Sequence, residues 1–374
     1  MNPEVLKTKD IAGCAIVGIL SEAGRPFNGE RIMRSIANMH DRSNGLGGGF
    51  AAYGIYPDHA EDYALHLMYD NISAKPTVEK LLARRCVIHH DESIPTRSIE
   101  VITGAPILHR YFVRATSEEL ERHHDMTEDD IIVSVVMSIN ANVDGAFVFS
   151  SGRNMGAFKG VGYPEDIGDF FRLDDYEGYL WLAHGRFPTN TTGWWGGAHP
   201  FGLLDWAVVH NGEISSYGIN RRYLDNFGYH CTLQTDTEVI TYLFDLLVRK
   251  QGLTLEAACK ALAPPFWSDI ERMPASERAL ARAIRMVYGG AMLNGPFSLV
   301  VASQGWMMGF NDRIKLRPMV AARKDDLLYL ASEEAAIREV CRDPDVLWHA
   351  EGGVPIVGRL KGHDSPSMEV TDVA

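Results

Sequence analysis

Short, continuously apolar runs alternate with amphipathic stretches along most of the 374-residue chain. The run at 15–20 is rich in β-branched residues, which predicts a buried strand. Similar runs predict further strands at 50–56, 86–88, 131–137, 145–150, 181–186, 206–209, 297–302, 306–309 and 327–330. Apolar residues spaced three and four positions apart predict helices at 235–250, 254–262, 276–288 and from residue 332 onward.

The chain shows no internal repeat, no low-complexity segment and no Pro/Ser-rich linker. These features favour one domain over residues 14–374, with an insertion at about 58–150 whose sequence is the least informative. Residues 1–13 would be a short leader. This leader carries charged residues and has no apolar core, so it is not expected to be a secretory signal.

Composition narrows the possible partners and the compartment. The net charge of −13 argues against nucleic acid and anionic membranes as partners. No window approaches the roughly 18 to 20 apolar residues of a membrane-spanning helix. The five cysteines are widely spaced and form no C-x-x-C pair, which favours reduced thiols in the cytoplasm and neither zinc nor iron–sulfur on this chain.

Cys14 opens the first predicted strand, and two interpretations of it remain. It could be a small hydrophobic residue of that strand. If the peptide bond between Gly13 and Cys14 were cut, however, Cys14 would carry a free α-amine beside its thiol. An α-amine titrates near pH 8, so one residue would supply both a nucleophile and a general base.

Three further features fit an acyl-transfer site that holds an amino acid. Asn211 and Gly212 offer a side-chain amide and a glycine N–H, the donor pair that a tetrahedral oxyanion needs, although Asn-Gly also forms ordinary turns. Arg186, at a predicted strand end, can grip a carboxylate bidentately or serve as a surface arginine. Asp236, at a predicted helix start, can pair with an ammonium group or cap the helix.

Two histidine clusters suggest metal ligands at first sight. They are His89-His90-Asp91-Glu92 and His123-His124-Asp125. Adjacent histidines point in different directions on a helix or a strand, and neither cluster has a recognised metal spacing, so a solvated surface is the favoured interpretation.

The chain resembles the class-II glutamine amidotransferases, N-terminal-nucleophile enzymes that hydrolyse glutamine with a processed cysteine. The matching stretches are Cys14–Ile19, the glycine-rich loop to Phe50, His184–Thr191, His210–Ile214, Thr235–Glu238, Gly295–Val300, Asp312, Leu316–Pro318 and Ser332–Glu333. Within the family, the stretch from Arg186 through His199-Pro200-Phe201 to Ile214 is similar to glutamate synthase. Two departures are Ala15, where the family usually has glycine, and the loop sequence Arg42-Ser43-Asn44-Gly45.

The resemblance implies an α+β fold, a four-layer αββα sandwich of two antiparallel sheets. It also implies residue roles: Cys14 as nucleophile, Asn211 and Gly212 as the oxyanion hole, Arg186 and Asp236 as substrate clamps. Phe187, Thr189 and His210 would line the glutamine pocket.

No acceptor half accompanies these motifs, so the resemblance implies a stand-alone glutaminase subunit. It would pass ammonia to a glutamate synthase-like partner that carries flavin and iron–sulfur, with no cofactor on this chain. One alternative is the equivalent subunit of an N-methylglutamate synthase-type complex. An alternative of another class is a non-catalytic, glutamine-binding regulatory subunit.

Overall fold

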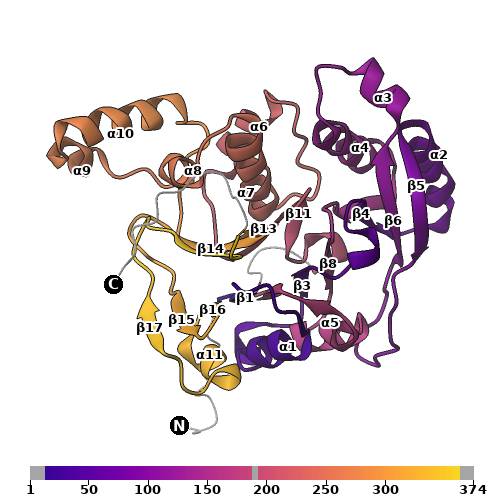
Figure 1. Cartoon of the computed structure of the whole chain (residues 1–374), viewed down its shortest axis with the longest axis horizontal. Coiled ribbons are helices and arrows are strands. Elements are labelled where there is room, and N and C mark those ends of the chain that lie inside the picture. The colour runs from indigo at the N-terminus through magenta and orange to yellow at the C-terminus, as the bar shows by residue number, and fades with distance from the viewer. Residues whose placement is uncertain (1–12, 188–192, 363–374) are drawn as a thin grey trace, which may run out of the picture.

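The computed structural model describes residues 13–187 and 193–362. In this part of the chain, two antiparallel sheets stack face to face at the centre of the molecule (Figure 1). The first sheet has seven strands, in the order β17 (Val346–His349), β15 (Val320–Lys324), β16 (Leu327–Ala331), β1 (Ala15–Ser21), β10 (Leu180–Gly185), β3 (Gly48–Tyr53) and β8 (Met155–Gly160). The second has five, in the order β11 (Phe201–Leu203), β12 (Trp206–Gly212), β13 (Phe297–Ser303), β14 (Trp306–Asn311) and β18 (Ile356–Arg359).

Helices cover the outer face of each sheet. Those on the seven-stranded sheet are α1 (Glu30–Ala37), α5 (Pro164–Phe170) and α11 (Glu334–Val340). Those on the five-stranded sheet are α6 (Tyr217–Asp225), α7 (Asp236–Phe244) and α8 (Leu255–Leu262). A π-helical turn, Asp245–Lys250, continues α7. The predicted four-layer αββα sandwich of two antiparallel sheets is therefore confirmed.

Both faces of the central strands are buried, which explains why their sequences are continuously apolar. One hydrophobic cluster, including Ile16, Leu182 and Val209, fills the space between the two sheets. Two larger clusters lie between each sheet and its helices. All seven residues of β1 are buried, since alternate side chains face the opposing sheet and the helical layer.

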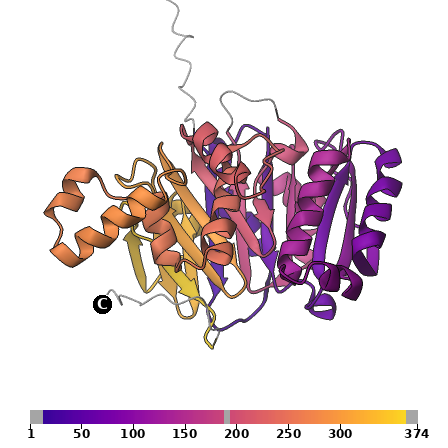
Figure 2. The ribbon, with the colours of Figure 1, turned by 90° about the horizontal axis from the view of Figure 1, so that it is seen from above.

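A third sheet lies at one end of the sandwich (Figure 2). Its four strands run in the order β5 (Cys86–Ser93), β6 (Ile107–Ala115), β4 (Tyr63–Tyr69) and β7 (Ala146–Ser150). Its helices are α2 (Lys75–Arg85), α3 (Ser117–Arg122) and α4 (Glu128–Asn142). A small ladder pairs β2 (Phe27–Asn28) with β9 (Glu177–Gly178). Helices α9 (Trp267–Arg272) and α10 (Ala275–Val287) project from the opposite end (Figures 1 and 2).

The strand predicted at 131–137 is wrong, because these residues belong to α4. The helix is buried on most sides, so its sequence is an apolar run without helical periodicity. Thr127 and Asp130 form a capping box that starts the helix, with hydrogen bonds of 3.2 Å in both directions. Such short apolar runs do not distinguish a buried helix from a strand.

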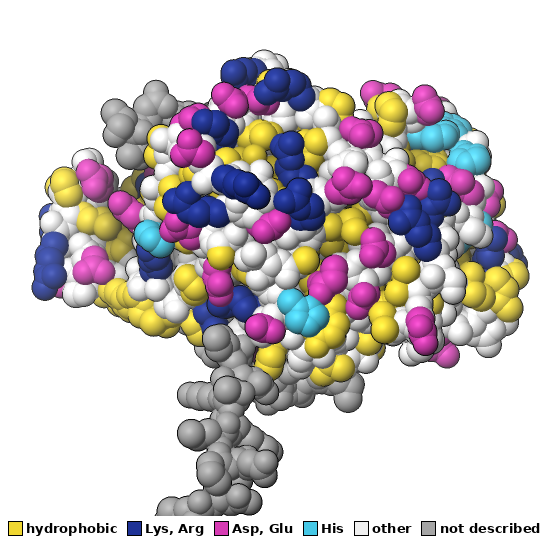
Figure 3. Space-filling model, turned by 90° about the horizontal axis from the view of Figure 1, so that it is seen from below, with side chains coloured by type: hydrophobic (Ala, Val, Ile, Leu, Met, Phe, Trp, Pro, Cys, Tyr) yellow, Lys and Arg dark blue, Asp and Glu magenta, His cyan; other side chains and the backbone are white. Residues whose placement is uncertain are grey.

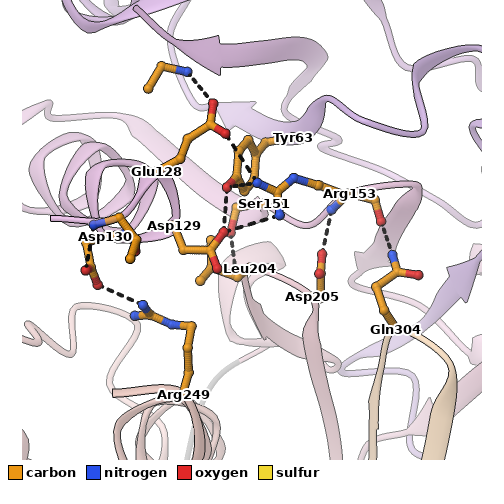
Figure 4. Close-up of polar contacts among 12 residues, drawn as sticks. Tyr63, Glu128, Asp129, Asp130, Ser151, Arg153, Leu204, Asp205, Arg249 and Gln304 are labelled. Carbon is orange, nitrogen blue, oxygen red and sulfur yellow. Dashed lines mark hydrogen bonds and ion pairs between the residues drawn. The ribbon is translucent and has the colours of Figure 1, made fainter. Parts of the chain in front are cut away.

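The first turn of α4 ties the third sheet to the sandwich through three successive carboxylates (Figure 4). Glu128 and Asp129 each lie 3.4 Å from the guanidinium of Arg153, which belongs to the turn between β7 and β8. Asp130 accepts a hydrogen bond from Arg249 Nη1 at 2.7 Å. Carboxylates at a helix N-terminus are also favoured by the helix dipole, so the anchor and the helix start reinforce each other.

No helix in the described ranges is long and apolar enough to cross a membrane.

Candidate active site

Cys14 lies immediately before β1, where the first strand of the buried sheet begins. Its carbonyl oxygen accepts a hydrogen bond from Arg42 Nε at 3.3 Å, and its Sγ accepts one from the backbone N–H of Phe187 at 3.5 Å. Ala15 pairs with Gly185, so the ladder of β1 and β10 brings the cysteine close to Phe187. The side chain remains partly exposed.

The thiol of Cys14 does not ionise readily by itself. Burial raises its pKa above the ordinary value, and nearby Asp236 adds to this effect. The N–H of Phe187 and the charges of Arg186 and Arg317 oppose the rise without cancelling it. A nucleophilic role therefore requires a base close to the sulfur.

Asn211 and Gly212 end β12, in the sheet that faces β1. The strand continues three residues beyond the predicted end at Val209. Asn211 is fully buried and its Nδ2 donates to Ser332 Oγ at 3.3 Å. At Gly212 φ is +154°, and a Cβ would lie 2.1 Å from the carbonyl oxygen of Pro296, so only glycine fits there.

Ser332 connects the two sheets at this point. Its Oγ accepts hydrogen bonds from Asn211 Nδ2 and from the backbone N–H of Ile16 at 3.2 Å. Its own N–H donates to the Ile16 carbonyl at 3.0 Å. Ser332 therefore sets the position of the Asn211 amide relative to the strand that begins after Cys14.

Arg186 directly follows β10 and is 8% exposed. Its backbone N–H donates to the Gly47 carbonyl at 2.8 Å, and its carbonyl accepts from Ser43 Oγ at 3.2 Å. The glycine-rich loop thus holds the backbone from which the guanidinium extends. Burial lowers the pKa of Arg186, while the charges of Cys14 and Asp236 act in the opposite direction.

Asp236 is the first residue of α7, and the helix cap is Thr235, whose side chain accepts from the Glu238 N–H at 3.1 Å. The alternative that Asp236 caps the helix with its side chain is therefore wrong. One carboxylate oxygen accepts from the Ile214 N–H at 2.9 Å, and the other lies 3.6 Å from His210 Nδ1.

The carboxylate of Asp236 stays ionised at neutral pH. Burial by itself would raise its pKa, but His210, the Ile214 N–H and the Thr237 hydroxyl together hold that pKa below the ordinary value. A negative charge is thus maintained close to Arg186 and Cys14, and it acts to raise the pKa of both side chains.

Three buried histidines, His184, His199 and His210, form a connected group next to Asp236 and Thr237. The rings of His184 and His199 stack with centroids 3.9 Å apart, and His184 Nε2 lies 3.0 Å from the His210 carbonyl oxygen. Thr237 Oγ1 lies 2.7 Å from His199 Nε2 and 3.2 Å from His210 Nδ1. Burial lowers the pKa of His184 to about 3, and it also lowers that of His199. His210 Nδ1 contacts both Asp236 and Thr237. His210 thus helps to position the Asp236 carboxylate.

Of the other residues predicted for the pocket, Phe187 contributes its N–H to Cys14 Sγ. Thr189 lies outside the described residues. The structure thus brings Cys14, Arg186, Phe187, His210, Asn211, Gly212 and Asp236 into one region, from β1, β10, β12 and α7.

Lys159 is a site neighbour that the sequence pattern did not single out. It lies in β8, is completely buried, and donates from Nζ to the Gly196 carbonyl at 3.0 Å. Its ammonium also lies 4.1 Å from the centroid of the Phe201 ring. Burial lowers its pKa to about 7, with Arg186 acting in the same direction and Glu238 opposing. The sequence feature that could have identified Lys159 is its position as a single charged residue in the otherwise apolar segment 155–160.

The histidine clusters noted in the sequence lie beside neighbouring carboxylates. His89 Nδ1 lies 2.8 Å from Asp62, and His123 Nε2 lies 3.7 Å from Glu119. Across residues 13–187 and 193–362, no group of three or more His, Cys, Asp or Glu side chains is arranged to hold a metal ion.

Comparison with known proteins gives a family match for the middle of the chain. Residues 55–232 match the family described as Glutamine amidotransferases class-II, a range that contains Arg186, Asn211 and Gly212 but neither Cys14 nor Asp236. A protein of Archaeoglobus fulgidus with no described function is 49% identical over 363 residues, 96% of either chain. A protein of Methanothermobacter thermautotrophicus, provisionally named a glutamine amidotransferase, is 25% identical over 92% of this chain and 99% of its own length.

Part of the chain is also similar to larger enzymes. The glutamine–fructose-6-phosphate aminotransferase of Pseudomonas putida is 30% identical over 188 residues, 48% of this chain and 27% of that protein. Among solved structures, the glutamine phosphoribosylpyrophosphate amidotransferase of B. subtilis gives a TM-score of 0.47 at 14% identity, over 92% of this chain and 47% of that one. The match over residues 55–232 identifies a class-II glutamine amidotransferase domain in that part of the chain.

Proposed function

We propose that the chain hydrolyses glutamine to glutamate and ammonia, with Cys14 as the nucleophile. The observation that carries the proposal is the convergence on one cysteine of a guanidinium, a carboxylate and a buried amide. Arg186 and Asp236 both act electrostatically on the Cys14 thiol, and Ser332 links the Asn211 amide to the strand that starts after that cysteine. A positive and a negative clamp beside a thiol match the α-carboxylate and α-ammonium groups of an amino acid.

The proposed reaction begins with removal of residues 1–13. Water is added across the Gly13–Cys14 peptide bond, which frees the α-amine of Cys14. The free amine then supplies the base that the raised pKa of the Cys14 thiol makes necessary.

In each cycle, the Cys14 α-amine takes the thiol proton while the sulfur attacks the side-chain amide carbon of glutamine. The tetrahedral oxyanion receives hydrogen bonds from the Asn211 amide and the Gly212 N–H. Collapse breaks the carbon–nitrogen bond, the amine returns the proton to the leaving nitrogen, and ammonia departs. Water then hydrolyses the thioester, giving glutamate and the free thiol.

We further propose that the ammonia passes to a partner subunit of the glutamate synthase type, which would carry flavin and iron–sulfur in the cytoplasm. The similarity of the stretch from Arg186 to Ile214 to glutamate synthase supports this proposal. An N-methylglutamate synthase-type complex would use the same glutaminase, and it is distinguished by a requirement for methylamine in the reconstituted reaction.

A non-catalytic glutamine-binding subunit is the competing function. It is favoured by one observation: in the unprocessed chain the Cys14 nitrogen is an amide and cannot serve as a base. A combined experiment separates the two functions. Intact mass of the protein from its native host reports the leader, and glutamate release from glutamine reports catalysis.

Hydrolysis together with loss of residues 1–13 supports the enzyme. A retained leader, with glutamine binding and no glutamate release, would establish the regulatory function. A glutamine-mimicking electrophile should label Cys14 alone, since Cys14 is partly exposed whereas Cys86, Cys231, Cys259 and Cys341 are buried.

A further inference from the structure

Two arginine–aromatic pairs lie side by side where the α9–α10 projection leaves the body. Arg285 of α10 has its Cζ 4.5 Å from the ring centroid of Trp267. Arg313, in the loop after β14, has its Cζ 5.1 Å from the ring centroid of Phe266. The two aromatic side chains are nevertheless 46% and 42% exposed, so each ring presents part of its surface to solvent.

Both guanidinium groups are partly buried, and in the described part of the chain their hydrogen bonds go to neutral oxygens. Arg285 donates to the Pro265 carbonyl. Arg313 donates to the Leu293 carbonyl at 3.2 Å and to Asn294 Oδ1 at 3.0 Å. Within the described ranges, neither forms an ion pair with a carboxylate.

Asp312, the residue before Arg313, already holds backbone N–H groups with its carboxylate. Asp312 accepts backbone hydrogen bonds from Phe297 at 3.2 Å, Ile314 at 3.1 Å and Leu316 at 2.9 Å. Burial lowers the pKa of both Arg285 and Arg313, and Arg285 further lowers that of Arg313. The negative charge of Asp312 acts on the pKa of Arg313 in the opposite direction. The two positive charges are therefore close enough to repel each other, and among the described residues neither forms an ion pair with a carboxylate.

The segments that carry this pair of charges also expose apolar side chains. In α10 the only buried residue is Ile284, and Leu280 and Val287, on the same helix face, are 57% and 67% exposed. Ile314, beside Arg313, is 55% exposed. Figure 3 shows hydrophobic side chains along the projection at the left of that view. We call Phe266, Trp267, Leu280, Arg285, Val287, Arg313 and Ile314 the docking patch.

We propose that the docking patch binds a segment of the ammonia-accepting subunit that presents a carboxylate flanked by apolar side chains. The carboxylate pairs with Arg285 and Arg313, and its apolar neighbours pack on Phe266 and Trp267. Tryptophan and arginine are enriched among residues that dominate binding energies, and a desolvated ion pair needs its counter-charge from the partner. The identity of this partner rests on the function proposed above.

A second copy of the chain is a poor occupant for the patch. In a dimer whose two-fold axis passes through the patch, the patch faces its own copy. Two docking patches facing each other would bring four guanidinium groups together without a carboxylate, which is unfavourable in a desolvated contact.

The docking patch is also connected to the candidate active site by direct contacts. Asn294, which accepts from Arg313, accepts at its own carbonyl a hydrogen bond from the Ser215 N–H at 2.8 Å. The preceding residue, Ile214, donates its N–H to Asp236. Hydrogen bonds through Asn294, Ser215 and Ile214 therefore link Arg313 of the patch to the substrate clamp.

The test compares two double charge reversals in the complex of this chain with the flavin-bearing subunit, both purified from the native host. The first is Arg285→Glu with Arg313→Glu. The matched control is Lys80→Glu with Arg84→Glu, which makes the same change of net charge on exposed residues of α2, at the other end of the molecule. Binding is measured by titration, and glutamine hydrolysis is measured on each variant alone.

The docking-patch variant should bind the flavin-bearing subunit at least about 100-fold more weakly, whereas the α2 variant should bind like wild type. A photo-crosslinking residue at position 280 should attach to a partner peptide that contains Asp or Glu among apolar residues. Equal binding by both variants, a crosslink to a second copy of this chain, or no complex with wild type would each overturn the docking proposal. Failure of the wild-type protein to hydrolyse glutamine would instead overturn the proposed function, since binding to the partner is measured in a separate assay.

Discussion

The side-chain amide of Asn211 is held by Ser332, whose Oγ accepts its hydrogen bond at 3.3 Å. An amide carries two N–H bonds, so one is fixed by Ser332 and the other is left for an oxyanion. Ser332 also accepts from Ile16 N–H, and it thereby couples the donor to the strand of the nucleophile. Ser332 is thus assigned as a positioning residue for the oxyanion donor.

Replacing Ser332 with alanine should lower kcat about tenfold with little change in KM, because oxyanion contacts strengthen only in the transition state. Asn211→Ala should cost about 10²–10³ in kcat. The double variant should be no worse than Asn211→Ala alone, since the serine acts through the asparagine.

Ser298 provides a matched control for that series. It lies directly opposite Asn211 in the ladder of β12 and β13 and is fully buried. Within the described residues, its Oγ has no hydrogen-bond partner. Ser298→Ala should therefore leave kcat unchanged, and a loss equal to that of Ser332→Ala would show that any buried serine lost here disturbs the site.

The second prediction concerns the N-terminus. Fully active protein should begin at Cys14, because only a free α-amine can act as the base for a thiol whose pKa is raised by burial. N-terminal sequencing combined with a glutaminase assay measures this. Active enzyme that begins at Met1 or Asn2 would refute the role of the amine, and Cys341→Ala, which removes another thiol, should leave processing and activity intact.

The central strands were predicted well because they are buried on both faces and therefore carry uninterrupted apolar runs, whereas their arrangement as a sandwich was an expectation from the family resemblance. The same property caused the error at 131–137, where a helix buried on most sides produces a run indistinguishable from a strand. The residues predicted for the site were those whose chemical type is unusual at a strand end or helix start, such as Arg186 and Asp236.

Residues that act through long-range contacts were not predictable from the sequence as positioning groups. Ser332 is separated from Asn211 by 121 positions, and nothing local to either residue shows that they meet. Thr237 similarly joins His199 and His210, which only the packing of α7 onto the sheet brings together. Such roles depend on sheet pairing and layer packing, which a local pattern does not specify.

The third prediction uses the buried Lys159, whose pKa falls from its ordinary value to about 7 in the folded protein. Between about pH 7 and pH 10 the unfolded chain then binds more protons at this residue than the folded one. Stability should therefore rise with pH in this window, by about 2 kcal/mol from pH 7 to pH 9.

Lys159→Met should remove this rise, and urea unfolding of both proteins at several pH values measures it. Burial raises the pKa of neighbouring Glu238 to about 7, so its own contribution falls as pH increases from about 4 to 7 and lies below the window. Identical pH dependence in wild type and Lys159→Met would show that Lys159 keeps its ordinary pKa.

The last prediction tests whether Asp236 recognises an ammonium group. Its carboxylate carries a pKa below the ordinary value, so it should remain ionised, and the KM for glutamine should stay flat, until the pH falls below about 4. Asp236→Ala should reduce kcat/KM about tenfold to a hundredfold, largely through KM, because the ammonium is present in both the ground state and the transition state. Glutamine lacking its α-amine should be a poor substrate for wild type, and Asp236→Ala should discriminate far less against it. Asp225→Ala, at an exposed position at the end of α6, should keep the wild-type preference. If Asp236→Ala also keeps that preference, the carboxylate serves only to hold the Ile214 N–H and His210, and the amino-acid specificity must come from another group.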